Sequence, residues 1–127
     1  MNEKLKTQLL IGLGAVIVIA FGFLLFTAQS APGKYDDFAK CIKESGALFY
    51  GAFWCPHCQD QKHAFGTSAK YLPYIECSTP DSKGQLDVCK DAGIQAYPTW
   101  KFSDGSKQEG DMTLEKLAEK TSCALPE

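Results

Sequence analysis

The sequence predicts an α/β domain in which four strands alternate with helices, preceded by an N-terminal helix that spans a membrane. Three observations support this prediction. Residues 9–26 form an uncharged apolar run, helix and strand patterns alternate from residue 35 onward, and Cys55-Pro56-His57-Cys58 lies where a strand pattern gives way to a helix pattern. At 127 residues, the chain has room for one small domain besides the apolar run.

The apolar run determines where we expect the domain to lie. Residues 8–28 are long enough to cross a hydrocarbon core as a helix, which takes about 20 residues. Lys4 and Lys6 precede the run, so the positive-inside rule predicts that residues 1–7 stay in the cytoplasm. We therefore predict a single-pass cell-membrane protein with an uncleaved signal anchor, whose domain lies outside the cytoplasm in a periplasmic or extracellular space.

A removed signal peptide is the alternative to an anchor. Ala28-Gln29-Ser30 resembles the small-residue site at which signal peptides are cut. The apolar run is longer than the usual signal core of roughly 7–15 residues, which favours the uncleaved anchor. Both interpretations export the rest of the chain.

The first half of the domain begins after a linker. We assign the linker to residues 29–34, which contain Pro32-Gly33, and the domain to residues 35–127. Apolar residues with the spacing i, i+3, i+4 predict a helix over residues 35–45. Residues 47–53 are almost all apolar, as expected of a central strand that is covered on both faces.

The cysteine pair opens the next helix. We predict that helix over residues 56–69, because Pro56 suits a first helical turn, where its missing N–H costs no hydrogen bond. A strand at residues 71–76, a polar loop and a short helix at residues 85–92 follow, and Gly93 ends that helix.

A hairpin and a helix complete the domain. Asp104-Gly105 is a strong turn signal, and it predicts a hairpin between strands at residues 99–102 and 107–109. Thr113 has the side chain of a helix N-cap, and the helix that it begins is expected to run to residue 120.

The charge of the exported part excludes one class of partner. Residues 31–127 carry 11 lysines against 14 acidic residues, a net charge of −3, and the chain has no arginine. Nucleic-acid binding needs a clustered basic surface, which this composition does not supply. We therefore expect no nucleic-acid partner.

Six cysteines in so short a chain need an explanation. They are Cys41, Cys55, Cys58, Cys77, Cys89 and Cys123. In an exported domain an even number of cysteines favours disulfides, whereas in the cytosol it would point towards a metal site. The predicted export thus favours disulfide chemistry.

The pair Cys55 and Cys58 has the spacing of a redox-active dithiol. The attacking species is a thiolate, and Cys55 lies where the N–H groups and the dipole of a helix N-terminus favour negative charge. His57 can add a hydrogen bond or a positive charge to the same sulfur. Cys58, one turn further along, can resolve a mixed disulfide. A stabilised thiolate makes the disulfide a stronger oxidant, so His57 favours oxidation of substrates.

A structural disulfide and a metal site are the alternatives for this pair. A bridge across two intervening residues closes too small a loop to stabilise the fold much. Zinc would need two further ligands, and the chain has no second Cys-x-x-Cys. His63 could join the pair, which keeps a copper or zinc carrier open as a function of another class. We favour redox chemistry, with no cofactor and no metal.

Tyr97-Pro98-Thr99 is a second candidate part of the site. A cis bond before Pro98 would bring backbone groups of Tyr97 and Thr99 beside Cys55, where an extended peptide could pair with them. An ordinary trans proline at the start of a strand is the alternative. Trp54, with its neighbour Phe53, would flank the site as an apolar surface, unless these two aromatic side chains belong to the core.

These motifs together resemble the thioredoxin superfamily over about residues 35–123. Tyr50-Gly51-Ala52-Phe53-Trp54-Cys55-Pro56-His57-Cys58, followed by Tyr74-Ile75-Glu76-Cys77, Cys89-Lys90, Gly93-Ile94 and Tyr97-Pro98-Thr99-Trp100, is similar to the thioredoxin-like domain of bacterial and plant vitamin K epoxide reductase homologues. The resemblance implies a thioredoxin-like fold, with a central mixed sheet flanked by helices. It also implies that Cys55 is the nucleophile, Cys58 the resolving thiol and Pro98 a cis-proline.

The resemblance implies a partner as well. In that family the domain passes electrons from folding proteins to a quinone-reducing membrane protein. We therefore predict a protein thiol–disulfide oxidoreductase that oxidises exported proteins and is re-oxidised in trans by a separate membrane protein that resembles vitamin K epoxide reductase or is similarly quinone-linked. A reductase supplied by a membrane electron donor is the alternative with the opposite direction.

One position departs from the family pattern. Thioredoxins carry a buried acid six residues before the first active cysteine, where it accepts a proton, and this chain has Phe49 there. Deprotonation of Cys58 must then use another group or water.

The remaining cysteines can form two bridges. Cys77 ends a predicted strand and Cys89 lies on the next helix, so a bridge between them is easy to form and would contribute roughly 3 kcal/mol. A relay of electrons between the active pair and a membrane partner is the other role open to them. Cys41 and Cys123 could tie the first helix to the chain end, or remain buried thiols.

Overall fold

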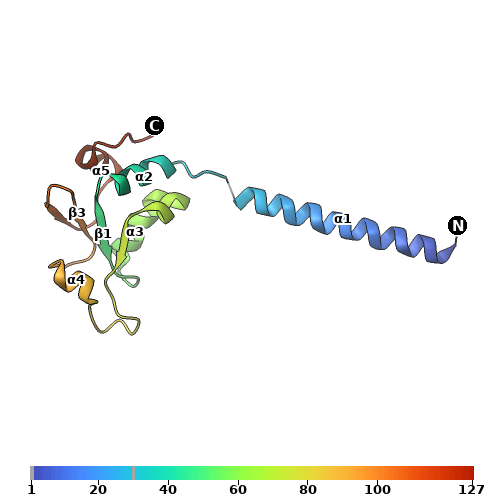
Figure 1. Cartoon of the computed structure of the whole chain (residues 1–127), viewed down its shortest axis with the longest axis horizontal. Coiled ribbons are helices and arrows are strands. Elements are labelled where there is room, and N and C mark those ends of the chain that lie inside the picture. Colours follow the sequence, from blue (N-terminus) through green and yellow to red (C-terminus); the bar gives the residue numbers. More distant parts are fainter. Residues whose placement is uncertain (1, 30) are drawn as a thin grey trace. The chain divides into compact units, whose positions relative to one another are not determined.

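The computed structural model describes residues 2–29 and 31–127. Met1 and Ser30, which belong to the predicted cytoplasmic end and the predicted linker, lie outside the described residues. The chain divides into two compact units, Met1–Pro32 and Gly33–Glu127, which Figure 1 shows and which are described separately below.

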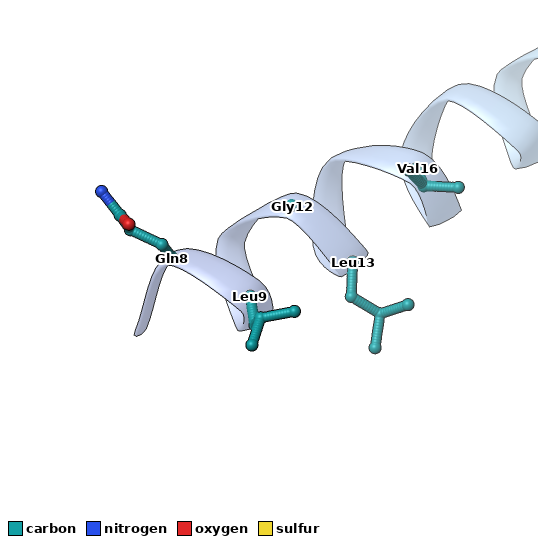
Figure 2. A pocket seen from close by; sticks show the side chains of 5 residues that line it. All are labelled: Gln8, Leu9, Gly12, Leu13 and Val16. Carbon is teal, nitrogen blue, oxygen red and sulfur yellow. The ribbon is translucent and has the colours of Figure 1, made fainter. Parts of the chain in front are cut away.

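The first unit is a single helix, α1, over Glu3–Gln29. Its segment Glu3–Thr27 is long and apolar enough to cross a membrane, judged by length and composition. Figure 2 shows a shallow depression on one side of this helix, where Gly12 has no side chain between its neighbours Gln8, Leu9, Leu13 and Val16. The apolar helix predicted over residues 8–28 is therefore present.

The second unit is built on a four-stranded mixed sheet. Its strands are β1 (Leu48–Gly51), β2 (Tyr74–Glu76), β3 (Thr99–Lys101) and β4 (Lys107–Glu109), in the spatial order β2-β1-β3-β4. Strand β1 runs parallel to β2 and antiparallel to β3, and β4 completes the predicted hairpin with β3. The fold predicted from the sequence, a mixed sheet of four strands with flanking helices, is thus confirmed.

The helices of this unit follow the predicted order. They are α2 (Asp36–Glu44), α3 (Pro56–Phe65), the 3-10 helix η1 (Gly66–Tyr71), α4 (Asp87–Asp91) and α5 (Leu114–Thr121). In the described part of the unit, α2 packs against both η1 and α5. Figure 1 shows α2 and α3 beside the central strands.

Several predicted elements are shorter in the structure. The strand predicted over residues 71–76 begins at Tyr74, and the helix predicted over residues 85–92 spans Asp87–Asp91. The helix predicted over residues 56–69 ends at Phe65, because Gly66 has a φ of 55° that cannot continue an α-helix, and the chain goes on as η1. The strand predicted over residues 47–53 ends at Gly51, because the carbonyl of Ala52 already accepts the N–H of Cys55 in a turn.

Aromatic side chains fill the core between the sheet and the helices. Phe49 and Trp100, on neighbouring strands, are fully buried and stacked with their ring centroids 4.7 Å apart. On the helix side, Phe38 stacks on Phe65 at 5.7 Å. Phe49 also meets the ring of Tyr74 edge-on at 5.2 Å. The first residues of the active-site loop therefore continue from a rigid central strand.

Candidate active site

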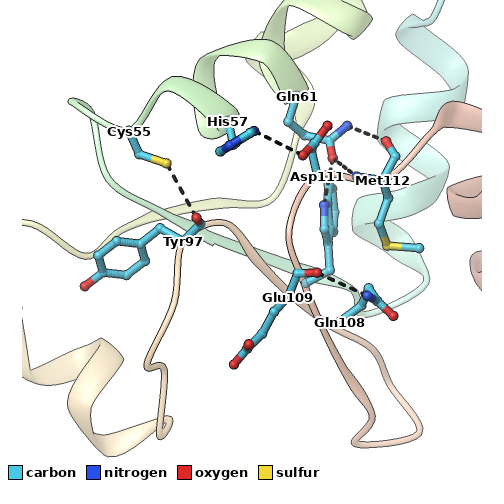
Figure 3. A network of polar contacts seen from close by, with 9 residues as sticks. Cys55, His57, Gln61, Tyr97, Gln108, Glu109, Asp111 and Met112 are labelled. Carbon is cyan, nitrogen blue, oxygen red and sulfur yellow. Dashed lines mark hydrogen bonds and ion pairs between the residues drawn. The ribbon is translucent and has the colours of Figure 1, made fainter.

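Cys55 lies at the junction between β1 and α3. It is the N-cap of α3, its N–H donates to the carbonyl of Ala52 at 3.0 Å, and its own carbonyl accepts the N–H of Gln59 at 3.1 Å. The thiol donates to the carbonyl of Tyr97, with 3.6 Å between Sγ and O (Figure 3). Cys55 is therefore fixed at the N-terminus of α3, with its sulfur against the Tyr97 carbonyl.

Cys58 lies one turn further along α3 and is fully buried. Burial raises the pKa of the Cys58 thiol to about 12, and its hydrogen bond with Cys55 acts in the same direction. The positive charge of Lys62 acts in the opposite direction on this pKa. Both cysteines are free thiols in the structure, and burial keeps the proton on Cys58.

Pro98 lies in the loop that precedes β3, and this loop contacts Cys55 through the carbonyl of Tyr97. The peptide bond between Tyr97 and Pro98 is cis, and the carbonyl of Tyr97 faces Cys55. Thr99 follows in β3, where it is paired with Tyr50 on one side and Glu109 on the other. The Thr99 side chain is buried, and its hydroxyl donates to a backbone carbonyl at 2.8 Å. The backbone group beside Cys55 is therefore that of Tyr97.

Trp54 and Phe53 are exposed next to the cysteine pair. Their side chains are 50% and 46% exposed, so these residues do not belong to the core. The indole N–H of Trp54 donates to the hydroxyl of Ser78 at 2.8 Å, and its ring meets that of Tyr97 edge-on at 6.1 Å. Trp54 and Tyr97 thus present an ordered aromatic surface beside Cys55.

His57 contacts an acidic residue that the sequence did not indicate. Its Nδ1 lies 3.4 Å from Oδ1 of Asp111, and both side chains are more than half exposed. Figure 3 shows the imidazole directed at Asp111, while the sulfur of Cys55 is directed at Tyr97. Asp111 thus orients the imidazole of His57 at the start of α3.

A buried amide holds Asp111 in place. Gln61 is only 2% exposed, and its Oε1 accepts the N–H of Met112 at 2.7 Å and the indole N–H of Trp100 at 3.1 Å. Its Nε2 donates to the carbonyl of Met112 at 3.0 Å (Figure 3). The segment that carries Asp111 is therefore fastened to α3. The sequence signal for Gln61 was its position one turn after Cys58, on the buried face of the helix.

Glu76, at the end of β2, fastens the other side of the loop. Its Oε1 accepts the N–H of Phe53 at 3.2 Å and the N–H of Ser78 at 2.9 Å. Its Oε2 accepts the hydroxyl of Tyr74 at 2.7 Å. Sequence reasoning also missed these contacts, because they depend on β1 and β2 lying side by side, which local patterns do not reveal.

The other four cysteines are paired in the structure. Cys77 and Cys89 form a bridge with their Cα atoms 5.6 Å apart, and both residues are fully buried. Cys41 on α2 is joined to Cys123, just beyond α5, with a Cα–Cα distance of 5.9 Å. Only Cys55 and Cys58 therefore retain thiols that can exchange with another protein.

Metal-ligating side chains are not clustered in the described parts of the chain. Among residues 2–29 and 31–127, no three His, Cys, Asp or Glu side chains lie together in a group that could hold a metal ion. His63, the histidine considered as a further ligand, is exposed on α3.

Comparison with known proteins identifies the family. The thioredoxin family model matches residues 30–122. The chain belongs to the thioredoxin family. Its predicted membership of the thioredoxin superfamily is thus confirmed, and the cysteine pair at the start of α3 and the cis-proline loop lie within the matched residues.

Two curated relatives share part of their length with this chain. It is 46% identical over 92 residues to the thiol-disulfide oxidoreductase LTO1 of Arabidopsis thaliana. This alignment covers 68% of this chain and 24% of that protein. The chain is 26% identical over 82 residues to the protein disulfide-isomerase erp38 of Neurospora crassa, or 61% of this chain and 22% of that protein. The chain thus spans about a quarter of the length of these relatives.

Proposed function

We propose that this thioredoxin-family domain is a protein thiol–disulfide oxidoreductase, with Cys55 as nucleophile and Cys58 as resolving thiol. The observation that carries the proposal is the dithiol at the start of α3, with the sulfur of Cys55 against the Tyr97 carbonyl and that of Cys58 fully buried. The names of both relatives, an oxidoreductase and a disulfide-isomerase, support the same chemistry.

The oxidising reaction has two exchange steps. A substrate thiolate attacks Sγ of Cys55 in the Cys55–Cys58 disulfide, a mixed disulfide forms, and Cys58 leaves as a thiolate. Because burial raises the pKa of Cys58, this thiolate takes up a proton. A second substrate thiolate then attacks the substrate sulfur of the mixed disulfide and releases Cys55. Two electrons pass from the substrate to the Cys55–Cys58 disulfide. The substrate gains a disulfide, and the cysteine pair becomes a dithiol.

The substrate-binding surface consists of Trp54 and the loop before β3. The exposed ring of Trp54 packs beside that of Tyr97, and an extended peptide can lie along this loop with the backbone of Tyr97 facing its cysteine. The backbone of Thr99 is already paired on both sides, so Thr99 and Pro98 act by holding the loop in place.

The direction and the location belong to the same proposal. We expect α1 to anchor the domain to the cell membrane, with residues 35–127 outside the cytoplasm, because α1 is long and apolar enough and carries Lys4 and Lys6 near its N-terminal end. We expect the pair to be re-oxidised by a quinone-linked membrane protein similar to vitamin K epoxide reductase, and the substrates to be thiols and disulfides of exported proteins. The alternative is a reductase, in which a membrane electron donor supplies electrons to the pair and the pair reduces substrate disulfides.

The reduction potential of the Cys55–Cys58 pair tests this function. Equilibrated with glutathione, an oxidant is expected to have a potential above about −200 mV, whereas a value near that of thioredoxin, about −270 mV, would identify a reductase. The purified chain is also incubated with a reduced two-cysteine peptide to measure disulfide formation. Stoichiometric metal in the purified protein, with no exchange activity, would identify a carrier instead.

His57 is expected to raise this potential. A positive imidazole near the start of α3 stabilises the thiolate and therefore the reduced form, so His57→Ala should lower the potential by roughly 10–30 mV. His63→Ala, which changes an exposed histidine on the same helix, is the matched control and should leave the potential unchanged. An unchanged potential in His57→Ala would show that the imidazole acts on Asp111 alone.

A further inference from the structure

The resolving thiol needs a group that handles its proton. Cys58 must lose a proton before its sulfur can attack a mixed disulfide on Cys55, and burial holds that proton on the sulfur. Phe49 lies six residues before Cys55, and its fully buried ring is stacked on Trp100. A phenyl ring cannot accept a proton, so the acceptor lies elsewhere around Cys58.

Tyr74 and Cys58 both border the space beside Gly51. A Cβ atom placed on Gly51 would lie 2.8 Å from Cε2 of Tyr74 and 2.9 Å from Sγ of Cys58. The edge of the tyrosine ring and the sulfur therefore share the space above Gly51, which is free because glycine has no side chain. Cε2 is the ring carbon next to the one that bears the hydroxyl, so the hydroxyl end of the ring is the end near Gly51.

The hydroxyl of Tyr74 leads to a fixed carboxylate. It donates to Oε2 of Glu76 at 2.7 Å, while the N–H groups of Phe53 and Ser78 hold Oε1 in place. Glu76 is half-buried at the end of β2, so its carboxylate can exchange protons with water. Tyrosine and glutamate thus form a short path from the buried sulfur to solvent.

Lys62 completes this cluster on the helix side. Its Nζ lies 3.5 Å from the centroid of the Tyr74 ring, and its charge lowers the pKa of Cys58 against the effect of burial. Cys55 and Lys62 are the titratable groups that act on the pKa of Cys58. Tyr74 on β2 responds in turn to Cys58 and to its hydrogen-bond partner Glu76.

We propose that Glu76, acting through the hydroxyl of Tyr74, accepts the proton that Cys58 releases when it resolves a mixed disulfide on Cys55. The Cys58 proton passes to the Tyr74 oxygen as the Tyr74 proton passes to Glu76. The Cys58 thiolate then forms a bond with Sγ of Cys55, the mixed disulfide breaks, and its electron pair leaves with the substrate thiolate. When the pair oxidises a substrate, the same path returns a proton to the departing Cys58 thiolate.

This role rests on the proposed function and explains two features of the cluster. Burial, and then the contact with Glu76, raise the pKa of Tyr74, so the phenol keeps a proton and can only pass one on. The acidic residue of this path, Glu76, lies on β2, which pairs with β1. On β1, the buried position six residues before Cys55 is occupied by Phe49, which packs in the core. Glu76 is a positioning and proton-accepting residue that acts through Tyr74.

A thiol reagent with two observable steps separates the roles. The full chain, solubilised in detergent and reduced only at Cys55 and Cys58, is mixed with 5,5′-dithiobis(2-nitrobenzoate). Attack by Cys55 releases one coloured thiolate, and attack by Cys58 on the resulting mixed disulfide releases the second. Cys58→Ser, which should release only the first, assigns the two phases. Absence of a first phase in the unmodified chain would refute the proposed function itself.

Glu76→Gln and Tyr74→Phe are expected to slow the second phase by about tenfold or more at pH 7, and to change the first by less than about twofold. Glu76→Gln keeps an oxygen for the two backbone N–H groups, and Tyr74→Phe keeps the ring, so both preserve the packing. The difference in second-phase rate between these variants and the unmodified chain should shrink as pH rises, because hydroxide replaces the lost base. Glu109→Gln, an exposed carboxylate on β4, is the matched control and should not change either phase.

The pH dependence distinguishes proton transfer from support of the fold. If both variants release the second thiolate at the unmodified rate from pH 6 to pH 9, the proton goes directly to water and the proposal is wrong. It is equally wrong if the deficit of both variants is the same at every pH, since a lost base is compensated by hydroxide and a displaced loop is not. Recovery of the rate at high pH in Tyr74→Phe alone supports the proposal even if Glu76→Gln fails to fold.

Discussion

Replacing Cys55 by serine is expected to abolish disulfide exchange, with a fall in rate of at least about a thousandfold, because a serine hydroxyl does not form mixed disulfides. Replacing Cys58 by serine should instead leave a stable mixed disulfide between Cys55 and the substrate, because the resolving sulfur is missing. The difference follows from the structure, in which the Cys55 sulfur contacts the Tyr97 carbonyl and Cys58 is fully buried.

Mass spectrometry under non-reducing conditions measures both results. The two variants are incubated with a peptide that contains one disulfide, and the mass of any adduct is assigned to a cysteine after digestion. The adduct is expected on Cys55 of Cys58→Ser and absent from Cys55→Ser. An adduct on Cys58 of Cys55→Ser would reverse the two roles. His63→Ala should exchange at the unmodified rate.

Removing the bridge between Cys41 and Cys123 is expected to lower the free energy of unfolding by about 4.5 kcal/mol in the chain-entropy model. The bridge joins residues 82 apart in sequence, so it restricts a long loop of the unfolded chain. The bridge between Cys77 and Cys89 spans a sequence separation of only 12, and its removal should cost about 3 kcal/mol.

Urea unfolding of the full chain in detergent, followed by tryptophan fluorescence, compares the two losses. The variants are Cys41→Ala with Cys123→Ala, and Cys77→Ala with Cys89→Ala. A larger loss for the shorter bridge would show that native packing at Cys77 and Cys89, and not loop length, sets the contribution. If Cys77→Ala with Cys89→Ala instead abolished exchange with stability intact, this bridge would be a redox relay.

The order of elements could be predicted from the sequence because each one has a local signal. The apolar run of residues 47–53 indicated β1, Asp104-Gly105 marked the hairpin, and Pro56 marked the start of α3. Some boundaries differed for a local backbone reason, as at Gly66, whose positive φ separates α3 from η1. Local patterns do not report such angles.

The surroundings of the cysteine pair were harder to predict than the pair itself. Gln61 and Met112 are 51 residues apart in sequence, and only the folded chain brings them together to place Asp111 beside His57. Glu76 could be seen only as a charged residue before Cys77, because its contact with the loop depends on the pairing of β1 with β2. Contacts of this kind arise from the tertiary fold, on which a single sequence carries little information.

The bridge between Cys41 and Cys123 makes most of the domain a covalent ring. A protease that cuts once between these two residues opens the ring but releases no fragment, because both pieces stay joined through the sulfurs. Tension applied at Gly33 can extend only the few residues before Cys41, since the ring prevents further unravelling from that end. The sheet, the reactive pair and the loop before β3 all lie inside this ring, so they remain covalently joined after a single backbone cut.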